Sequence, residues 1–220
     1  ATTATYADPA SWRSSSEVEG SPGADGLGPD GRVVVNEVLA SSSLPRVDAI
    51  ELKNTTPEAI DLSGWFVADA DGALTADEYR LFRIPDGTVL PPGGYLVLDE
   101  REFNPNGAWN PSAGEPMPTE FSFDGAYGGH VWLVQADPST RQLQRFVDHV
   151  EFGASIDGVT LGRYPDGTGV LTPLAWQTLF DPTSDVTPLA KLAGPNSVPR
   201  SGPVVRNEIH YLLPPGDPGT

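Results

Sequence analysis

Apolar residues along this 220-residue chain gather in short runs separated by turn residues. The run "RVVVNEVLA" at 32–40 is rich in β-branched residues, which favour strands. In "DAIELKN" at 48–54, apolar and polar residues alternate, so Ile50 and Leu52 share one face of a strand and Glu51 points to the other. No stretch keeps the 3.6-residue apolar period of an amphipathic helix. The pattern therefore predicts a domain built of strands.

Turn signals define further strands in the middle of the chain. "AIDLSGWFVAD" at 59–69 holds a Ser-Gly break, and "YRLFRIPDGTVLPPGGYLVLDE" at 79–100 holds Pro-Asp-Gly and Pro-Pro-Gly-Gly, which predicts consecutive antiparallel strands and a hairpin at the second turn. "HVWLVQAD" at 130–137 and "QRFVDHVEFG" at 144–153 flank a polar turn and predict another hairpin. "TLGRYP" at 160–165 predicts a last short strand.

Many short strands with turns between them are typical of an all-β, antiparallel β-sandwich, which we place at residues 32–170. Residues 1–31 are rich in Ser, Gly, Pro, Ala and Asp, and we interpret them as a linker and the tail of a preceding repeat. Pro and polar residues return at 171–203, which we interpret as a closing segment and a second linker.

A five-residue sequence occurs twice. "VVVNE" at 33–37 recurs as "VVRNE" at 204–208, and the two Asn positions differ by 207 − 36 = 171 residues, about the size of a domain. Trp12 and Trp176 differ by 176 − 12 = 164 residues, which gives nearly the same period. We therefore expect residues 204–220 to be the first strand of a following repeat, cut short, so that the chain is a fragment of a tandem array.

Composition narrows the function classes. Acidic residues outnumber basic ones 30 to 13, and the net charge of −17 would repel a nucleic-acid backbone. The chain has no cysteine, which excludes disulfides, thiolate metal sites and a cysteine nucleophile. No apolar run approaches the ~18 residues that a transmembrane helix needs. We expect no nucleic-acid partner and no membrane span.

Three segments together resemble a bacterial lamin tail domain: "VVVNEVLA", "DAIELKNTTPEAIDLSGWFVAD" and "FRIPDGTVLPPGGYLVL". The resemblance extends from about residue 33 to residue 169 and implies an immunoglobulin-like β-sandwich. It also implies an accessory module of large secreted or surface proteins, often repeated, with no catalytic residues to carry over. The loop at 101–120 is longer and richer in Pro than the family pattern.

One acidic segment matches part of a calcium-binding loop. In "VADADGALTADE" at 67–78, Asp69, Asp71 and Glu78 hold the third, fifth and twelfth positions of an EF-hand-like loop. The first position is Val67, which is no ligand. The alternative is an acidic hairpin whose Asp and Gly residues serve the turn. Calcium is the only cofactor that the sequence suggests.

The sequence gives little support for catalysis. The three histidines are too dispersed for a helical metal motif, although strands can bring two of them together. Asp148 and His149 are adjacent in a predicted strand, so they point to opposite faces and form no dyad. There is no G-x-S-x-G motif either. We predict that the protein is not an enzyme, and that Glu37 makes a structural hydrogen bond or ion pair near a sheet edge.

Aromatic residues in loops are the remaining candidates for ligand binding. Phe103 and Trp109 fall in the long loop, and Tyr127 falls in "DGAYGGHVW". Such rings stack on sugar faces or anchor a protein partner, but they also pack locally. Trp65 and Trp132 lie on predicted strands, where we expect core positions.

Two functions remain. The first is a non-catalytic structural or interaction module, for adhesion or display, of a larger secreted or cell-surface bacterial protein, with the neighbouring domains of its own chain and an unidentified protein or glycan as partners. The alternative is a carbohydrate- or calcium-dependent binding module.

Overall fold

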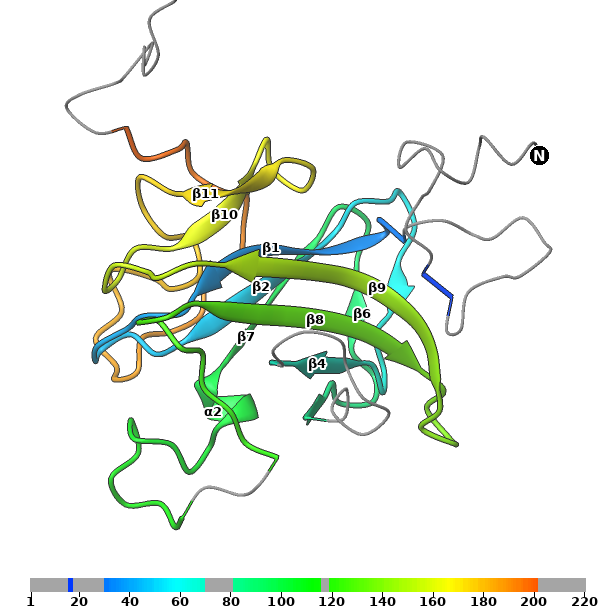
Figure 1. Cartoon of the computed structure of the whole chain (residues 1–220), viewed down its shortest axis with the longest axis horizontal. Helices are drawn as coiled ribbons and strands as arrows, with labels where there is room; N and C mark the ends of the chain where they lie inside the picture. The colour runs from blue at the N-terminus through cyan, green and yellow to red at the C-terminus, as the bar shows by residue number, and fades with distance from the viewer. Residues whose placement is uncertain (1–15, 18–29, 70–80, 116–118, 202–220) are drawn as a thin grey trace, which may run out of the picture.

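The computed structural model describes residues 16–17, 30–69, 81–115 and 119–201, and two antiparallel sheets dominate it (Figure 1). The first sheet has the strand order β11-β10-β1-β2-β7, the second has the order β5-β4-β8-β9, and β3 pairs with β6 beside them. The strands are β1 Val33–Leu39, β2 Ala49–Asn54, β3 Ile60–Asp61, β4 Phe66–Ala68, β5 Phe82–Arg83, β6 Val89–Leu90, β7 Tyr95–Asp99, β8 Gly129–Ala136, β9 Leu143–Phe152, β10 Leu161–Tyr164 and β11 Val170–Pro173.

The two sheets enclose one apolar core and so confirm the predicted immunoglobulin-like β-sandwich. Side chains from β1, β2 and β7 meet side chains from β4, β8 and β9 between the sheets, and burying such apolar surface is the main favourable contribution to folding. The core includes Val35, Ile50, Leu52, Val67 and Leu133, none of which is exposed. Trp65, which directly precedes β4, belongs to this core at 3% exposure, so its predicted core position is confirmed.

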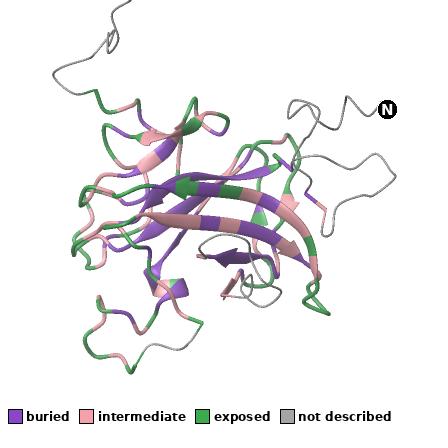
Figure 2. Cartoon of the chain, viewed as in Figure 1, coloured by how far each residue is buried: buried purple, intermediate pink, exposed green. Residues whose placement is uncertain are grey.

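Strand β1 is buried along its whole length because both of its faces are covered (Figure 2). A β-bulge shifts its register against β2 between Val35 and Glu37, so the side-chain alternation changes phase at Asn36. Val35 faces the core between the sheets, whereas Glu37 and Leu39 face the other side. β1 lies between β10 and β2, so the predicted position of Glu37 near a sheet edge is wrong.

Residues 174–197 cover the outer face of the five-stranded sheet, and we call them the closing segment. Leu179, Phe180 and Leu189 pack there on Leu39 and Ala49, in a second apolar cluster. The absence of a side chain at Gly162 makes space for Leu174 of this segment, since a Cβ at position 162 would lie 2.6 Å from the Leu174 side chain. Strand β11 also adds to this sheet. Packed structure therefore continues to Arg200, whose N–H donates to the carbonyl oxygen of Pro173, beyond the boundary at 170 that the sequence predicts.

The hairpin predictions have a mixed outcome. β8 and β9 form the predicted hairpin, with Asp137 accepting hydrogen bonds from the backbone N–H groups of Ser139 and Thr140 in the turn. The Pro-Pro-Gly-Gly turn, by contrast, joins β6 to β7, which do not pair: β6 pairs with β3, and β7 pairs with β2. The prediction of a hairpin there is wrong, because the turn carries the chain from one sheet to another.

The long loop after β7 begins with a short helix, α2 Glu100–Phe103, whose N-terminus is capped by a capping box between Asp99 and Glu102. Phe103 ends this helix and is only 2% exposed, with its ring stacked on Phe121 at 4.8 Å. Of the two alternatives for this loop aromatic, ligand binding and local packing, the structure favours packing for Phe103, because its side chain closes one end of the core.

Within the described ranges, no helix is both long enough and apolar enough to cross a membrane.

Candidate functional site

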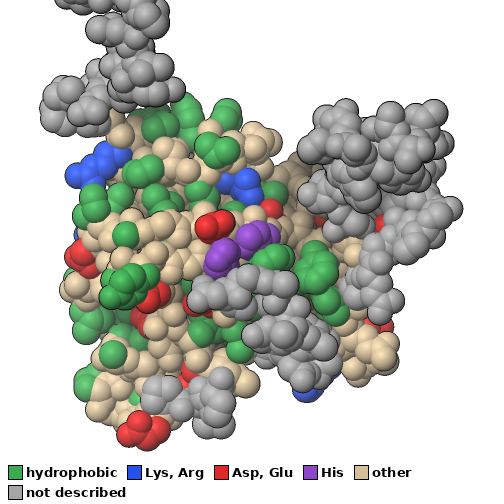
Figure 3. All heavy atoms as spheres, viewed as in Figure 1, with side chains coloured by type: hydrophobic (Ala, Val, Ile, Leu, Met, Phe, Trp, Pro, Cys, Tyr) green, Lys and Arg blue, Asp and Glu red, His purple; other side chains and the backbone are tan. Residues whose placement is uncertain are grey.

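A polar hollow opens beside the start of the β8–β9 ladder. Its volume is about 440 Å³. Three carboxylates, one imidazole and one phenol line it together with backbone, and the lining residues are Asp69, Asp124, Tyr127, Gly128, Gly129, His130, Glu151 and Phe152. In Figure 3 the two described histidine side chains lie together on this face of the molecule.

A tight turn before β8 shapes the hollow. The Asp124 carboxylate accepts hydrogen bonds from the backbone N–H groups of Ala126 and Tyr127, at 2.9 and 3.0 Å. Gly128 then adopts a φ of +91°, and a Cβ there would lie 2.2 Å from the carbonyl oxygen of Phe152, so only glycine fits. The turn leaves the Tyr127 ring 88% exposed at the rim.

Antiparallel pairing brings His130 and His149 together. His130 lies opposite Glu151, and Trp132 lies opposite His149, so the two histidines are diagonal neighbours on the outer face of the ladder. His130 Nδ1 and His149 Nε2 are 3.0 Å apart, and the Trp132 ring stacks on the His149 ring with centroids 3.8 Å apart. Trp132 is partly buried on this outer face rather than in the core where the sequence places it.

Burial lowers the pKa of His149, and the neighbouring His130 lowers it further, whereas Asp148 and Glu151 act in the opposite direction. His149 is therefore neutral at physiological pH, with one ring nitrogen as donor and the other as acceptor. Asp148 points to the opposite face of β9, where its carboxylate binds Arg163 and the backbone N–H of Val35. The prediction that Asp148 and His149 form no dyad is confirmed.

The residues predicted to hold calcium or a ligand have different positions. Asp69 lines the hollow, while Asp71 and Glu78 lie outside the described residues. Trp109 is half-buried against the closing segment, and its Nε1–H donates to the carbonyl oxygen of Asn104 at 3.0 Å. Only Tyr127 of the three predicted aromatics is an open ring beside a pocket. In the described ranges, no three His, Cys, Asp or Glu side chains are arranged to hold a metal ion.

A second polar site lies between the five-stranded sheet and the closing segment, with Asn36, Glu37 and Glu51 fully buried in it. The Asn36 side chain donates to Glu51 at 2.8 Å and to Asp166 at 2.9 Å, and it accepts from the backbone N–H of Gly167. Asp166 also binds Lys53 and Tyr95. These contacts place several acids and the bulged Asn36 in one network.

Three carboxylates in this network bind the closing segment directly. Glu37 accepts from the N–H and hydroxyl of Thr178, Glu51 accepts from the N–H of Gly194 at 3.0 Å, and Asp166 accepts from the N–H of Asn196 at 3.1 Å. We call Asn36, Glu37, Glu51 and Asp166 the acid latch, because together they hold the closing segment on the sheet.

Burial dominates the electrostatics of the acid latch. It raises the pKa of Glu51 to about 8, with hydrogen bonds from Asn36 and Gly194 opposing it and the nearby Glu37 and Asp166 adding to it. Burial also raises the pKa of Glu37. Asp166 differs: burial alone would raise its pKa, but hydrogen bonds from Lys53, Asn36, Asn196 and Tyr95 bring it below the usual range. Glu51 is therefore protonated at neutral pH.

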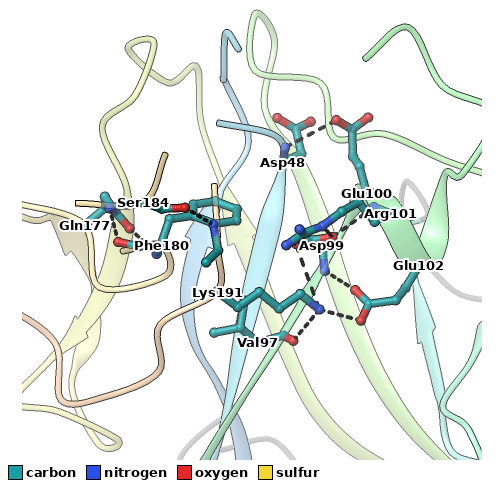
Figure 4. A network of polar contacts seen from close by, with 11 residues as sticks. Asp48, Val97, Asp99, Glu100, Arg101, Glu102, Gln177, Phe180, Ser184 and Lys191 are labelled. Atoms are coloured by element: carbon teal, nitrogen blue, oxygen red, sulfur yellow. Dashed lines mark hydrogen bonds and ion pairs between the residues drawn. The ribbon is translucent and has the colours of Figure 1, made fainter. Parts of the chain in front are cut away.

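A third set of polar contacts joins the closing segment to β7 and α2 (Figure 4). Lys191 donates to the carbonyl oxygen of Val97 at 3.0 Å and binds the Glu102 carboxylate. Nearby, burial raises the pKa of Asp48 to about 7, although a hydrogen bond from Ser42 opposes the shift. Asp48 also accepts from the N–H of Phe123, and its own N–H donates to Glu100 at 3.3 Å. These acids position loops against the sandwich.

Strand topology explains which of these groups the sequence could reveal. His130 and His149 lie in two strands of a predicted hairpin, so the sequence could place them near each other, but two register shifts between the turn and the histidines hide their diagonal pairing. The acid latch gives no comparable signal, since Glu37 and Thr178 are 141 positions apart.

Fold and sites together define a β-sandwich module with a buried acid latch and a polar hollow beside the β8–β9 ladder. The family model of the lamin tail domain matches residues 28–150, more than half of the chain, and the protein belongs to the lamin tail domain family. That family is a structural, immunoglobulin-like domain family. No curated protein matches the chain.

Proposed function

We propose that this protein is a non-catalytic structural or interaction module of a larger secreted or cell-surface bacterial protein, in which it spaces, displays or adheres. The observation that most supports this proposal is that the buried acids bind the closing segment of the same domain. Buried acids with raised pKa values are the groups from which active sites are built. Here Glu37 and Glu51 are enclosed and bonded to the chain's own closing segment.

The acid latch also gives a physical reason for the repeated sequence. In "VVVNE" the Asn and Glu are Asn36 and Glu37, which hold the closing segment of their own domain. The same pair recurs as Asn207 and Glu208 in "VVRNE". We propose that residues 204–220 begin another domain, so the first partners of this module are neighbouring domains of the same parent chain.

Protease treatment of intact cells tests the proposed location. An antibody against the chain should lose its signal when whole cells of the source bacterium are digested, while a cytosolic marker stays intact. Signal that is protected until the cells are lysed would contradict a surface position, unless the parent protein is recovered from the culture medium.

A carbohydrate-binding role is the second candidate, and one observation favours it. The exposed Tyr127 ring stands beside a hollow lined by Asp124 and Glu151, and sugars are bound by an aromatic face together with carboxylates that accept from hydroxyl groups. A glycan array should then show binding that Tyr127→Ala abolishes. Tyr164→Ala is the matched control, because Tyr164 is a 44% exposed ring on β10, away from the hollow. No binding by the unaltered chain would remove this candidate.

Calcium dependence remains a proposal based on Asp69, Asp71 and Glu78. A ligand that binds only the folded state raises the melting temperature. Millimolar calcium should therefore raise the Tm of the chain, and Asp71→Asn should remove the effect. An unchanged Tm would rule out a stabilising calcium site.

A further inference from the structure

The outer face of the β8–β9 ladder carries a group of side chains that the acid latch and the sandwich core do not use. His130 and Glu151 form one directly opposed pair, and Trp132 and His149 form the next. Because β-strand side chains alternate, all four project from the same face. Two imidazoles, one carboxylate and one indole thus share a small area of surface.

The two imidazoles face each other through ring nitrogens. His130 Nδ1 and His149 Nε2 are 3.0 Å apart, the ring planes differ by 13°, and the ring centroids are 5.2 Å apart. The centroid separation exceeds the nitrogen separation by about two ring radii, so the rings lie nearly in line and share one N–H···N hydrogen bond. One nitrogen donates its proton and the other offers a lone pair.

This arrangement brings two imidazole nitrogens close together before any ion arrives. The His149 ring stacks on Trp132, and the cross-strand ladder fixes the backbones of both strands. Glu151 adds negative charge directly opposite His130.

We propose that His130 and His149 form a two-histidine site for a divalent transition metal, with Cu²⁺ or Ni²⁺ as the best-fitting ions. Imidazole nitrogen is a preferred ligand for these metals. In the described ranges no third metal ligand converges with the pair, so water completes the coordination shell. The inference does not rest on the proposed structural or carbohydrate-binding function.

Nitrogen spacing selects between metals. With metal–nitrogen bonds of about 2.0 to 2.1 Å, two nitrogens 3.0 Å apart subtend an angle of about 90 to 100° at the ion. That angle suits neighbouring positions of a tetragonal Cu²⁺ or Ni²⁺ site. Tetrahedral Zn²⁺ needs a wider angle and a larger spacing.

Binding breaks the N–H···N hydrogen bond and turns both rings by roughly 40° from the line between the two nitrogens, which is the base angle of a triangle with sides of about 2.0 to 2.1 Å and a base of 3.0 Å. The ring that donates the N–H···N bond changes tautomer, so that its proton moves to its other nitrogen, and both facing nitrogens then present lone pairs. Side-chain rotation turns these lone pairs toward a common point outside the ladder. The two metal–nitrogen bonds replace the hydrogen bond.

Titration calorimetry with Cu²⁺ or Ni²⁺ on the full 220-residue chain tests the proposal, in a buffer that does not bind metals. The chain has three histidines and no cysteine, so His210→Gln is a matched control. We expect one ion per chain for the unaltered protein and for His210→Gln. His130→Gln and His149→Gln should each weaken binding at least tenfold.

A second measurement keeps the test valid if a variant fails to fold. Substoichiometric Cu²⁺ should broaden the ring NMR signals of both His130 and His149 in the unaltered chain before it broadens those of His210. Absence of binding, binding that survives both single substitutions in folded variants, or broadening confined to His210 would overturn the proposal.

Discussion

Replacing Glu51 by Gln should flatten the pH dependence of stability. The folded-state pKa of Glu51 lies above its ordinary value of 4.5, at about 8, so between these values the folded state binds more protons than the unfolded state. The stabilisation that Glu51 contributes is fully present below about pH 4.5, and it is lost as the pH rises through about 8. The domain should therefore be less stable at pH 9 than at pH 5.

The size of the effect follows from the shift. A rise from 4.5 to about 8 corresponds to roughly 5 kcal/mol at about 1.4 kcal/mol per pKa unit, which is an upper limit because the buried site relaxes on ionisation. Asp48, with a pKa of about 7, contributes with the same sign and remains in the variant. Glu51→Gln also loses one acceptor, for Asn36 or for the N–H of Gly194, at a cost of about 1 kcal/mol.

The two stability curves should therefore cross. Below pH 5, Glu51→Gln should be about 1 kcal/mol less stable than the unaltered chain, and at pH 9 it should be more stable by a few kcal/mol. Urea unfolding at a series of pH values, followed by tryptophan fluorescence, measures this. Glu58→Gln, at an exposed carboxylate, should follow the unaltered curve. If Glu51→Gln also runs parallel to that curve from pH 5 to 9, the pKa of Glu51 is not raised in the folded state and the reasoning is wrong.

Three further substitutions test the acid latch and the loop that begins with α2. Asn36→Ala removes hydrogen bonds to Glu51, Asp166 and Gly167, so urea unfolding should show a free energy of unfolding lower by about 3 kcal/mol. A decrease of less than about 0.5 kcal/mol would show that the acid latch is not needed for stability. Phe103→Ala should lower the free energy of unfolding by about 3 to 5 kcal/mol because it empties a core position. Trp109→Ala should lower it less, because Trp109 is only partly buried. Equal, small decreases for both variants would contradict the core position of Phe103.

Much of the fold can be predicted from the sequence because the signals are local. The β-branched run of β1, the alternation in β2 and the polar turn between β8 and β9 each fix a strand or hairpin from neighbouring residues. The alternation fails at one point: Glu51 is fully buried although it lies opposite the Ile50 and Leu52 face. A polar residue on a strand normally indicates a face that is exposed to solvent, whereas here that face is covered by the closing segment.

The features that could not be predicted depend on distant partners. The closing segment has a Pro-rich composition like that of a linker, and only contacts such as Thr178 with Glu37 and Gly194 with Glu51 make it part of the domain. Phe103 appears as a loop aromatic in the sequence because the ring that stacks on it, Phe121, lies at the far end of the same loop. In both places tertiary contacts decide the outcome, and local composition does not report them.

The measurement that tests the central claim most directly compares two fragments, residues 16–201 and residues 16–170, by two-dimensional amide NMR and urea unfolding. The longer fragment should give dispersed signals and a cooperative transition. The shorter one lacks β11 and the closing segment, exposes Leu39 and Ala49, and leaves Glu37 and Glu51 without Thr178 and Gly194, so it should not fold. A shorter fragment with dispersed signals and the same stability as the longer one would contradict the account.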